Sequence, residues 1–108
     1  MALASIYIPA PNIEEGKRIA RFLLEKRYVA CVNIVENATS LYHWEGEIKE
    51  ETEVLLICKT LMRAVRHIIN DIKEIHPYDL PAVTAEPILK VNPEYAAWVE
   101  EVIDGGNF

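Results

Sequence analysis

The run Val54-Leu55-Leu56-Ile57-Cys58 is apolar at every position, and it lies at the centre of a segment, residues 48–60, that predicts a β-strand. Successive side chains of a strand point to opposite faces of its sheet. A strand that is apolar on both faces needs cover on both, whereas a sheet with one wet face alternates apolar and polar residues. This run therefore predicts a sheet whose two faces are both covered.

Three more segments predict strands, because each is rich in apolar and β-branched residues or alternates regularly. A bend at Gly46 is expected between the second and third strands. Pro87 cannot donate a hydrogen bond to a sheet, so the last strand is expected at an edge or at a bulge. The three segments are residues 3–8, residues 28–35 with a polar continuation over 39–45, and residues 82–91.

Three helices are predicted from apolar residues at helical spacing. The first begins at Asn12, three residues before Glu15, in a variant of the capping box, and continues to about Arg27. The second has its apolar stripe from Leu61 to residue 75. The third begins at Asn92-Pro93, where proline suits the first helical position, and ends before residues 105–106, which are both glycine.

The element order is β-α-β, β-α-β, then α, which predicts an α+β, ferredoxin-like fold with an antiparallel sheet and helices on one face. A length of 108 residues fits a single domain over residues 1–108. The chain has no spare domain to cover the second face of the sheet, so another copy of the chain is expected there. The alternative is that the short third helix folds across this open face.

The composition excludes several classes of protein. Seventeen acidic residues against 11 basic ones give a net charge of −6, which disfavours binding to the phosphates of a nucleic acid. Charges interrupt the apolar runs before the ~20 residues that a membrane span needs. The N-terminal residues lack the pattern of a signal peptide, and the two cysteines make no disulfide framework. The chain is therefore expected in the cytoplasm, with no nucleic-acid or membrane partner.

Aromatic and imidazole side chains mark the candidate site. Tyr42, Trp44, His76 and Tyr78 lie in polar, turn-rich segments, the last two beside a loop that prolines bracket. Such residues are typical of a binding site and also of a subunit interface, and both interpretations stay open. The sequence has no nucleophile motif and no glycine-rich phosphate loop, so no enzymatic activity is predicted. The acidic pair at residues 50–51 is expected on a solvated face.

Four blocks of the sequence resemble the CutA divalent-cation-tolerance family, in the family's order and over nearly the whole chain. They are Ala30-Cys31-Val32-Asn33, Ser40-Leu41-Tyr42-His43-Trp44-Glu45-Gly46, Cys58-Lys59-Thr60 and His76-Pro77-Tyr78-Asp79-Leu80-Pro81. One departure is Asp79, where the family usually has glutamate. The resemblance implies a homotrimer similar in architecture to the PII signalling proteins, with strands pairing between subunits.

The resemblance also implies a function. Members of the family are associated with tolerance to copper and other divalent metal ions, so the chain is expected to bind such ions. Cys31, at a position proposed to bind copper, and His76 are the expected metal ligands. The alternative is a PII-like signalling module that binds a small molecule in a cleft between subunits. The resemblance assigns this cleft to Asn33, Tyr42, Trp44, Lys59, His76, Tyr78 and Asp79.

Net charge bears on the choice between the two hypotheses. Three chains of charge −6 sum to −18, which attracts metal cations and repels anions at long range. Charge therefore favours the metal hypothesis over an anionic small molecule.

Overall fold

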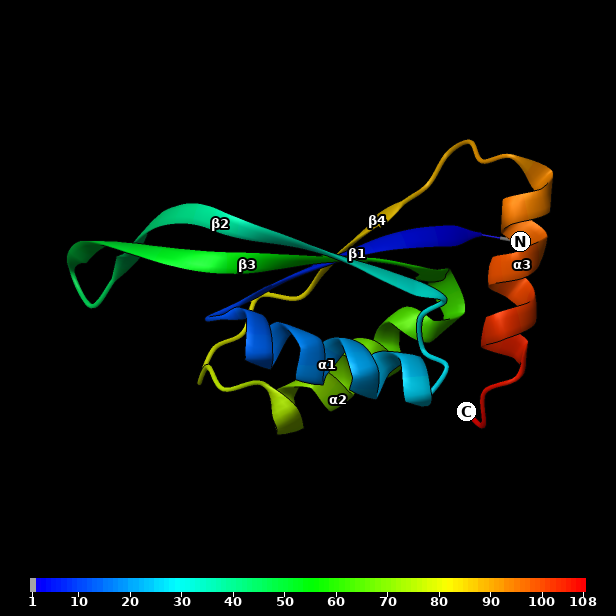
Figure 1. Cartoon of the computed structure of the whole chain (residues 1–108), viewed down its shortest axis with the longest axis horizontal. Helices are drawn as coiled ribbons and strands as arrows, with labels where there is room; N and C mark the ends of the chain where they lie inside the picture. The colour runs from blue at the N-terminus through cyan, green and yellow to red at the C-terminus, as the bar shows by residue number, and fades with distance from the viewer. Residues whose placement is uncertain (1) are drawn as a thin grey trace.

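A computed structural model describes residues 2–108 of the chain. Four strands and three α-helices follow the predicted order (Figure 1). A single 3₁₀ turn, η1, separates the third strand from the second helix. The elements are β1 (Leu3–Ala10), α1 (Ile13–Glu25), β2 (Cys31–Trp44), β3 (Glu47–Leu61), η1 (Met62–Ala64), α2 (Val65–Ile75), β4 (Thr84–Pro87) and α3 (Pro93–Asp104).

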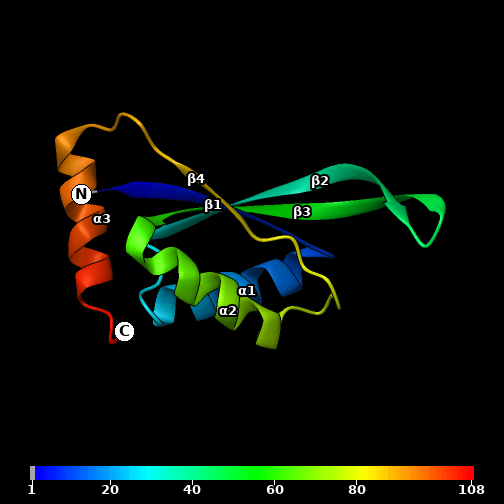
Figure 2. The ribbon, with the colours of Figure 1, turned by 180° about the vertical axis from the view of Figure 1, so that it is seen from behind.

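The strands form one sheet in the order β2-β3-β1-β4, and every neighbouring pair is antiparallel. Helices α1 and α2 lie side by side on one face of this sheet (Figure 2). This arrangement confirms the predicted α+β, ferredoxin-like fold. Pro87 ends β4, which is an edge strand, as its missing backbone donor requires.

Helix α1 begins as the sequence predicts, because the side chain of Asn12 accepts a 2.9 Å hydrogen bond from the backbone N–H of Glu15. Its end is two residues earlier than expected. Arg27 adopts a left-handed conformation with φ 59°, and Tyr28 N–H donates to the carbonyl of Leu23 at 3.0 Å. This closing pattern is a Schellman motif, which terminates the helix although no glycine is present.

Strand β2 differs from its prediction at both ends. It begins at Cys31 rather than at Tyr28, because the helix-closing turn uses Tyr28. It then runs without interruption to Trp44, since a bulge between Val35 and Ala38 absorbs one extra residue. Asn37 within the bulge has φ 62°, a conformation that asparagine tolerates better than most residues.

The second and third strands therefore form a long hairpin. The turn at residues 45–46 has positive φ at both positions, 49° and 78°, as a type I′ turn requires. Strands β2 and β3 pair up to Trp44 and Glu47, whereas β1 pairs with β3 only from residue 54 onward. We call the part beyond β1, residues 38–53, the arm. It extends past the helix layer (Figure 1).

Two other boundaries were wrong. Leu61, predicted as the start of the second helix, is the last residue of β3, and α2 begins only at Val65 after the 3₁₀ turn. The predicted strand over residues 82–91 is reduced to the four residues of β4. In both cases the apolar pattern continues beyond the backbone hydrogen bonds, because residues outside an element also pack against the core. The third helix follows its prediction, with Asn92 at its N-cap and Gly105 at its C-cap.

The core lies between the sheet and the two helices α1 and α2. It is built from fully buried side chains of all four elements that meet there, Ile6, Ile8, Ile19, Leu23, Leu56, Ile68 and Ile72. None of the helices in residues 2–108 is long and apolar enough to cross a membrane.

The opposite, open face of the sheet is covered only at one end. Helix α3 stands at that end (Figures 1 and 2), where Tyr95 Oη lies 3.1 Å from the sulfur of Cys31. Elsewhere on this face Leu55 and Ile57 are half-buried, and Tyr7 and Val35 are exposed. The third helix therefore covers one part of the open face. Much of the apolar surface of that face remains accessible in a single chain.

Candidate functional site

A cleft of about 770 Å³ lies between the arm and the loop that joins α2 to β4. Strands β1, β2 and β3 and the loop over residues 77–82 all contribute to it. We call it the arm cleft. Its lining is Tyr7, Pro9, Ser40, Tyr42, His43, Trp44, Lys49, Glu51, Glu53, Pro77, Tyr78, Asp79, Leu80 and Ala82.

The loop is fixed to the sheet by a chain of hydrogen bonds through His76. Nε2 of His76 lies 2.8 Å from the carbonyl oxygen of Pro9, and Nδ1 accepts a 3.1 Å hydrogen bond from the backbone N–H of Tyr78. A carbonyl can only accept and a backbone N–H can only donate, so the ring carries its proton on Nε2. His76 is buried, with both ring nitrogens engaged.

Tyr78 continues this chain into the cleft. Its hydroxyl donates a 2.6 Å hydrogen bond to Oε2 of Glu53, a carboxylate that is 9% exposed. Burial of the phenol, followed by the hydrogen bond to Glu53, raises the pKa of Tyr78 far above its usual value of about 10. The phenol therefore stays protonated and keeps donating to the carboxylate at every physiological pH.

A second tyrosine and carboxylate pair lies farther along the arm. Ser40 pairs with Glu51 and Tyr42 with Lys49 across β2 and β3, so these four side chains share one face. The Glu51 carboxylate, as the acceptor for the Tyr42 hydroxyl, raises the pKa of Tyr42. The cleft therefore combines neutral phenols with carboxylates that accept from them.

Four of the seven residues that the resemblance assigns to a ligand cleft line the arm cleft, namely Tyr42, Trp44, Tyr78 and Asp79. His76 lies behind Tyr78, with the two ring centroids 4.8 Å apart, and supports the loop instead of facing the cavity. Asn33 and Lys59 lie farther toward the α3 end of the sheet, where Asn33 pairs with Ile57 and Lys59 with Cys31. They do not line the arm cleft.

The predicted metal ligands do not come together in one chain. Cys31 is partly exposed on the open face beside Tyr95, whereas His76 is held by Pro9 and Tyr78. Within residues 2–108, no group of three or more His, Cys, Asp and Glu side chains is close enough to hold a metal ion. A single chain therefore does not provide a complete set of metal ligands.

The other cysteine behaves as a small apolar residue. Cys58 is fully buried in the core, and burial raises the pKa of its thiol to about 12. Deprotonation, which metal binding by a thiol requires, is therefore strongly disfavoured at this position.

Sequence reasoning missed the two glutamates of the cleft. Glu51 was expected on a solvated face and is indeed exposed, but its place in the cleft was not predicted, and Glu53 was not singled out. Their spacing of two residues on one strand is the signal that places both side chains on the same face. The loop that closes the cleft comes from a distant part of the sequence, so the burial of Glu53 could not be inferred from local pattern.

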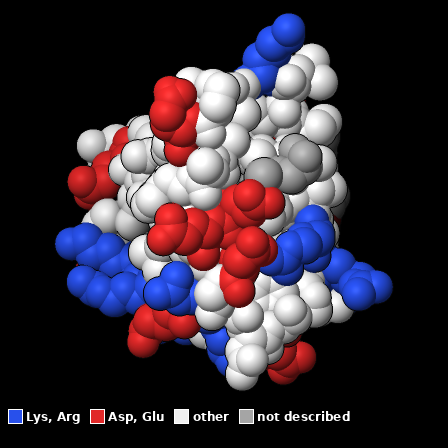
Figure 3. All heavy atoms as spheres, turned by 90° about the vertical axis from the view of Figure 1, so that its right-hand side faces the viewer, with Lys and Arg blue, Asp and Glu red and all other residues white. Residues whose placement is uncertain are grey.

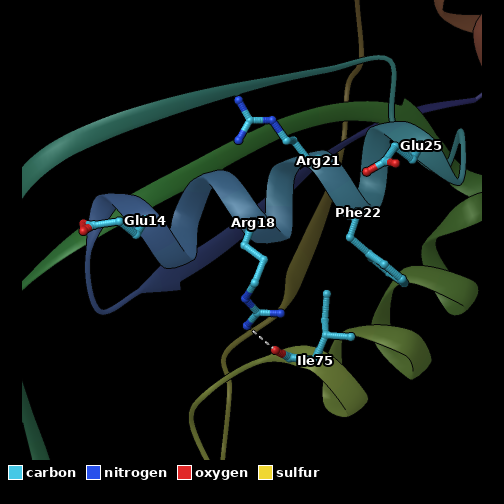
Figure 4. A pocket seen from close by; sticks show the side chains of 6 residues that line it. All are labelled: Glu14, Arg18, Arg21, Phe22, Glu25 and Ile75. Atoms are coloured by element: carbon cyan, nitrogen blue, oxygen red, sulfur yellow. Dashed lines mark hydrogen bonds between the residues drawn. The ribbon is translucent and has the colours of Figure 1, made fainter.

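A smaller hollow of about 430 Å³ lies on the helix side of the molecule (Figure 4). Arg18, Arg21 and Phe22 of α1 line it, together with Ile75 of α2. The guanidinium of Arg18 donates to the carbonyl of Ile75 at 2.5 Å and pairs with Glu15 at 2.7 Å. The Arg18 side chain therefore joins the two helices.

Charge is mixed at the end of the molecule that α3 covers. Acidic side chains gather in the middle of that face with basic side chains on both sides, and further acidic side chains lie toward its edges (Figure 3). One ion pair there joins Arg63 to Asp104 at 2.6 Å. In the arm cleft the balance is different, because Glu51, Glu53 and Asp79 face a single lysine, Lys49.

The fold and the cleft define an α+β protein with a ferredoxin-like sheet, a projecting hairpin and an acidic, aromatic cleft at its base. The family model described as CutA1 divalent ion tolerance protein matches residues 4–102. The chain belongs to this family. The family is named for tolerance to divalent ions and not for a reaction.

Individual relatives agree with this assignment. The divalent-cation tolerance protein CutA of Thermus thermophilus is 42% identical over 96 residues, which are 89% of this chain and 93% of that protein. The protein CutA of Mus musculus is 37% identical over 103 residues, and this chain spans 58% of the mouse protein's length. The crystal structure of CutA1 from Oryza sativa superposes with a TM-score of 0.92 at 36% identity, over 94% of each chain.

Proposed function

We propose that this protein forms a homotrimer that binds copper or another divalent metal ion as part of tolerance to such ions. The observation that carries the proposal is the position of Cys31 on the open face of the sheet, where a second copy is expected. A metal site that needs donors from more than one chain leaves no complete ligand set in a single chain. The absence of such a set within residues 2–108 fits this arrangement.

Apolar surface supports the assembly. Leu55 and Ile57 present apolar side chains on the open face. On the opposite face of the arm, Leu41 and Ile48 are 63% and 70% exposed and lie close to each other across the two strands. Exposed apolar groups that adjoin one another mark sites of association. The resemblance to the PII architecture implies that the assembly contains three copies of the chain. Ile57→Asp, which places a charge on the open face, should give a smaller particle in sedimentation, whereas Ile69→Asp on the outer surface of α2 should not.

Cys31 is the stronger of the two predicted ligands. Its thiol is partly accessible, and a thiolate is a preferred ligand of soft metal ions, among them divalent zinc and copper(I). Burial, followed by the contact with Cys31, raises the pKa of Tyr95 to about 12, so the phenol can donate to the sulfur while other lone pairs stay free for a metal. His76 becomes a ligand only if at least one of its two ring bonds breaks, most simply the bond from Tyr78 N–H to Nδ1, which frees that nitrogen while Nε2 keeps donating to Pro9.

Native mass spectrometry with one equivalent of copper per chain tests the proposal, since it reports particle mass and bound metal together. We expect a trimer with a defined number of copper ions, and loss of the metal in Cys31→Ser. Cys58→Ala is the matched control, because it removes the buried thiol. A monomer, or copper uptake that Cys31→Ser leaves unchanged, would overturn the proposal. Metal loss in His76→Gln at unchanged stability would add His76 as a ligand.

The arm cleft favours a second candidate function, the binding of a small molecule. A volume of about 770 Å³ lies within the range of small-molecule sites. Aromatic side chains with a few fixed polar groups are typical of such sites. By analogy with the PII proteins, a trimer could use this cleft to sense a small molecule. This candidate and the metal proposal use different residues and can be tested separately.

A further inference from the structure

The arm cleft contains acidic side chains that no basic side chain neutralises. Three salt bridges occur among residues 2–108, and none of them includes Glu51, Glu53 or Asp79. Lys49, the one lysine of the lining, is paired with Glu47 outside the cleft, at 3.0 Å. His43 is the remaining titratable lining group besides the tyrosines. The cleft therefore carries unbalanced negative charge.

The floor of the cleft is held in place by hydrogen bonds. Glu53 is 9% exposed and is held by the Tyr78 hydroxyl at 2.6 Å, while His76 fixes the backbone of Tyr78. A carboxylate that accepts one hydrogen bond from a phenol can still accept several more. Because Glu53 is already buried and oriented, a cationic donor that reaches it finds a preorganised partner.

The walls of the cleft are aromatic. Tyr7, Tyr42, Trp44 and Tyr78 all line it, and three of them are exposed enough in a single chain to contact a bound molecule. The faces of such rings attract cations, and they also pack against aliphatic carbon. A strongly hydrated metal ion makes little use of these walls, whereas an organic cation with an aliphatic body uses both properties.

We propose that the arm cleft binds an aliphatic amine that carries two or more ammonium groups. One ammonium group is held by the buried carboxylate of Glu53, the aliphatic chain lies against the aromatic walls, and Asp79 on the closing loop receives another ammonium group. This inference deepens the second candidate function and rests on it. It is independent of the metal proposal, which involves Cys31 on another part of the open face.

Three probes with the same five-carbon chain test the ligand class, namely 1,5-diaminopentane, neutral 1,5-pentanediol and the dianion of pentanedioic acid. Isothermal titration calorimetry of the full protein at physiological ionic strength measures each. We expect saturable binding of one diamine per chain, with the diol and the diacid weaker by about tenfold or more. If the diol or the diacid binds as tightly as the diamine, the inference is overturned and the small-molecule candidate survives. If none of the three binds, the inference is wrong and the small-molecule candidate loses its support.

Substitutions test the position of the ligand. Glu53→Gln removes the charge but keeps an oxygen that can accept from Tyr78, and we expect it to weaken diamine binding by about tenfold. Glu74→Gln, on the exposed surface of α2, is the matched control and should leave the affinity unchanged. Equal weakening by both variants would mean general attraction to an acidic surface and would overturn the inference. Asp79→Asn, in an exposed loop, repeats the test if Glu53→Gln does not fold.

The same samples separate this inference from the metal proposal. Cys31→Ser should abolish copper uptake and leave the affinity for the diamine unchanged. Copper uptake without diamine binding would reject the inference alone. Diamine binding without copper uptake would reject the metal proposal alone.

Discussion

Tyr78 and Glu53 are 25 residues apart in the sequence, and a 2.6 Å hydrogen bond from the phenol to the carboxylate joins them. The bond connects the loop after α2 to the middle of β3. Because of this bond, a movement of the loop would also change the orientation of the buried carboxylate. Several measurable consequences depend on this bond and its neighbours.

Tyr78→Phe should destabilise the protein by about 1–3 kcal/mol, because it leaves the buried Glu53 carboxylate without its donor. Urea denaturation followed by circular dichroism measures the change in the free energy of unfolding. Tyr42→Phe is the matched control, since Tyr42 is on the exposed arm. Equal effects of the two substitutions would contradict the structural role given to Tyr78.

His76→Phe should cost about 2 kcal/mol of stability, because it removes two hydrogen bonds of about 1 kcal/mol each. His67→Phe is the control, since among residues 2–108 the side chain of His67 makes ring contacts with Tyr28 and Phe108, which a phenyl ring can retain, and no hydrogen bond. Thermal unfolding of both variants gives the comparison. If His76→Phe is as stable as the parent protein, the two bonds do not secure the loop.

The folded state should lose stability as pH rises through 10 toward 12. The hydrogen bond to Asp71 raises the pKa of Tyr28 to about 12, and burial raises that of Tyr95 to about 12. Both phenols thus bind their protons more tightly in the folded chain than in the unfolded chain, where the pKa is about 10. Their stabilisation is fully present below pH 10 and decreases above it.

Absorbance at 295 nm, which follows phenol ionisation, checks this pH dependence. Tyrosines should titrate at higher pH in the native protein than in urea, and Tyr28→Phe should reduce the alkaline loss of stability. Identical titration curves in the two solvents would show that the fold does not protect these phenols.

Gly16→Ala should destabilise the contact between α1 and the sheet. A Cβ at this position would lie 3.0 Å from a methyl carbon of Val54 and 3.3 Å from one of Leu56. Overpacking costs about 1–3 kcal/mol, which outweighs the ~1 kcal/mol that alanine gains over glycine in a helix. Lys17→Ala, on the exposed face of α1, is the control in chemical denaturation. A Gly16→Ala variant more stable than the parent would show that the side chains of β3 can move aside.

Local patterns were sufficient to predict the order and type of the elements. The run over residues 54–58 and the helix signals at Asn12 and Asn92 each reflect interactions within a few residues. The boundary at Leu61 and the short β4 were missed because an apolar pattern records burial and not backbone pairing. The bulge at Asn37 was missed because the extra residue is polar and resembles a break between two strands.

The candidate site was predicted in part for a similar reason. Tyr42, Trp44, Tyr78 and Asp79 carry a recognisable pattern, and the fold brings them to one cleft. The roles of Glu53 and His76 depend on partners 25 and 67 residues away in the sequence. No local signal specifies such pairings, so the buried carboxylate and the fixed tautomer of the histidine became visible only in three dimensions.

The central position of β1 has a consequence for folding during synthesis. Of the four strands of the sheet, β1 is made first, yet it pairs with residues 54–61 of β3 and with residues 84–87 of β4. At about 5–20 residues per second, the ribosome needs roughly 3–10 s to make the ~50 residues that separate β1 from its first partner. The hairpin of β2 and β3 is local and can close as soon as it emerges. Strand β1, which is largely apolar, therefore stays unpaired until β3 has been made. It is then inserted between β3 and β4, which the ribosome makes later.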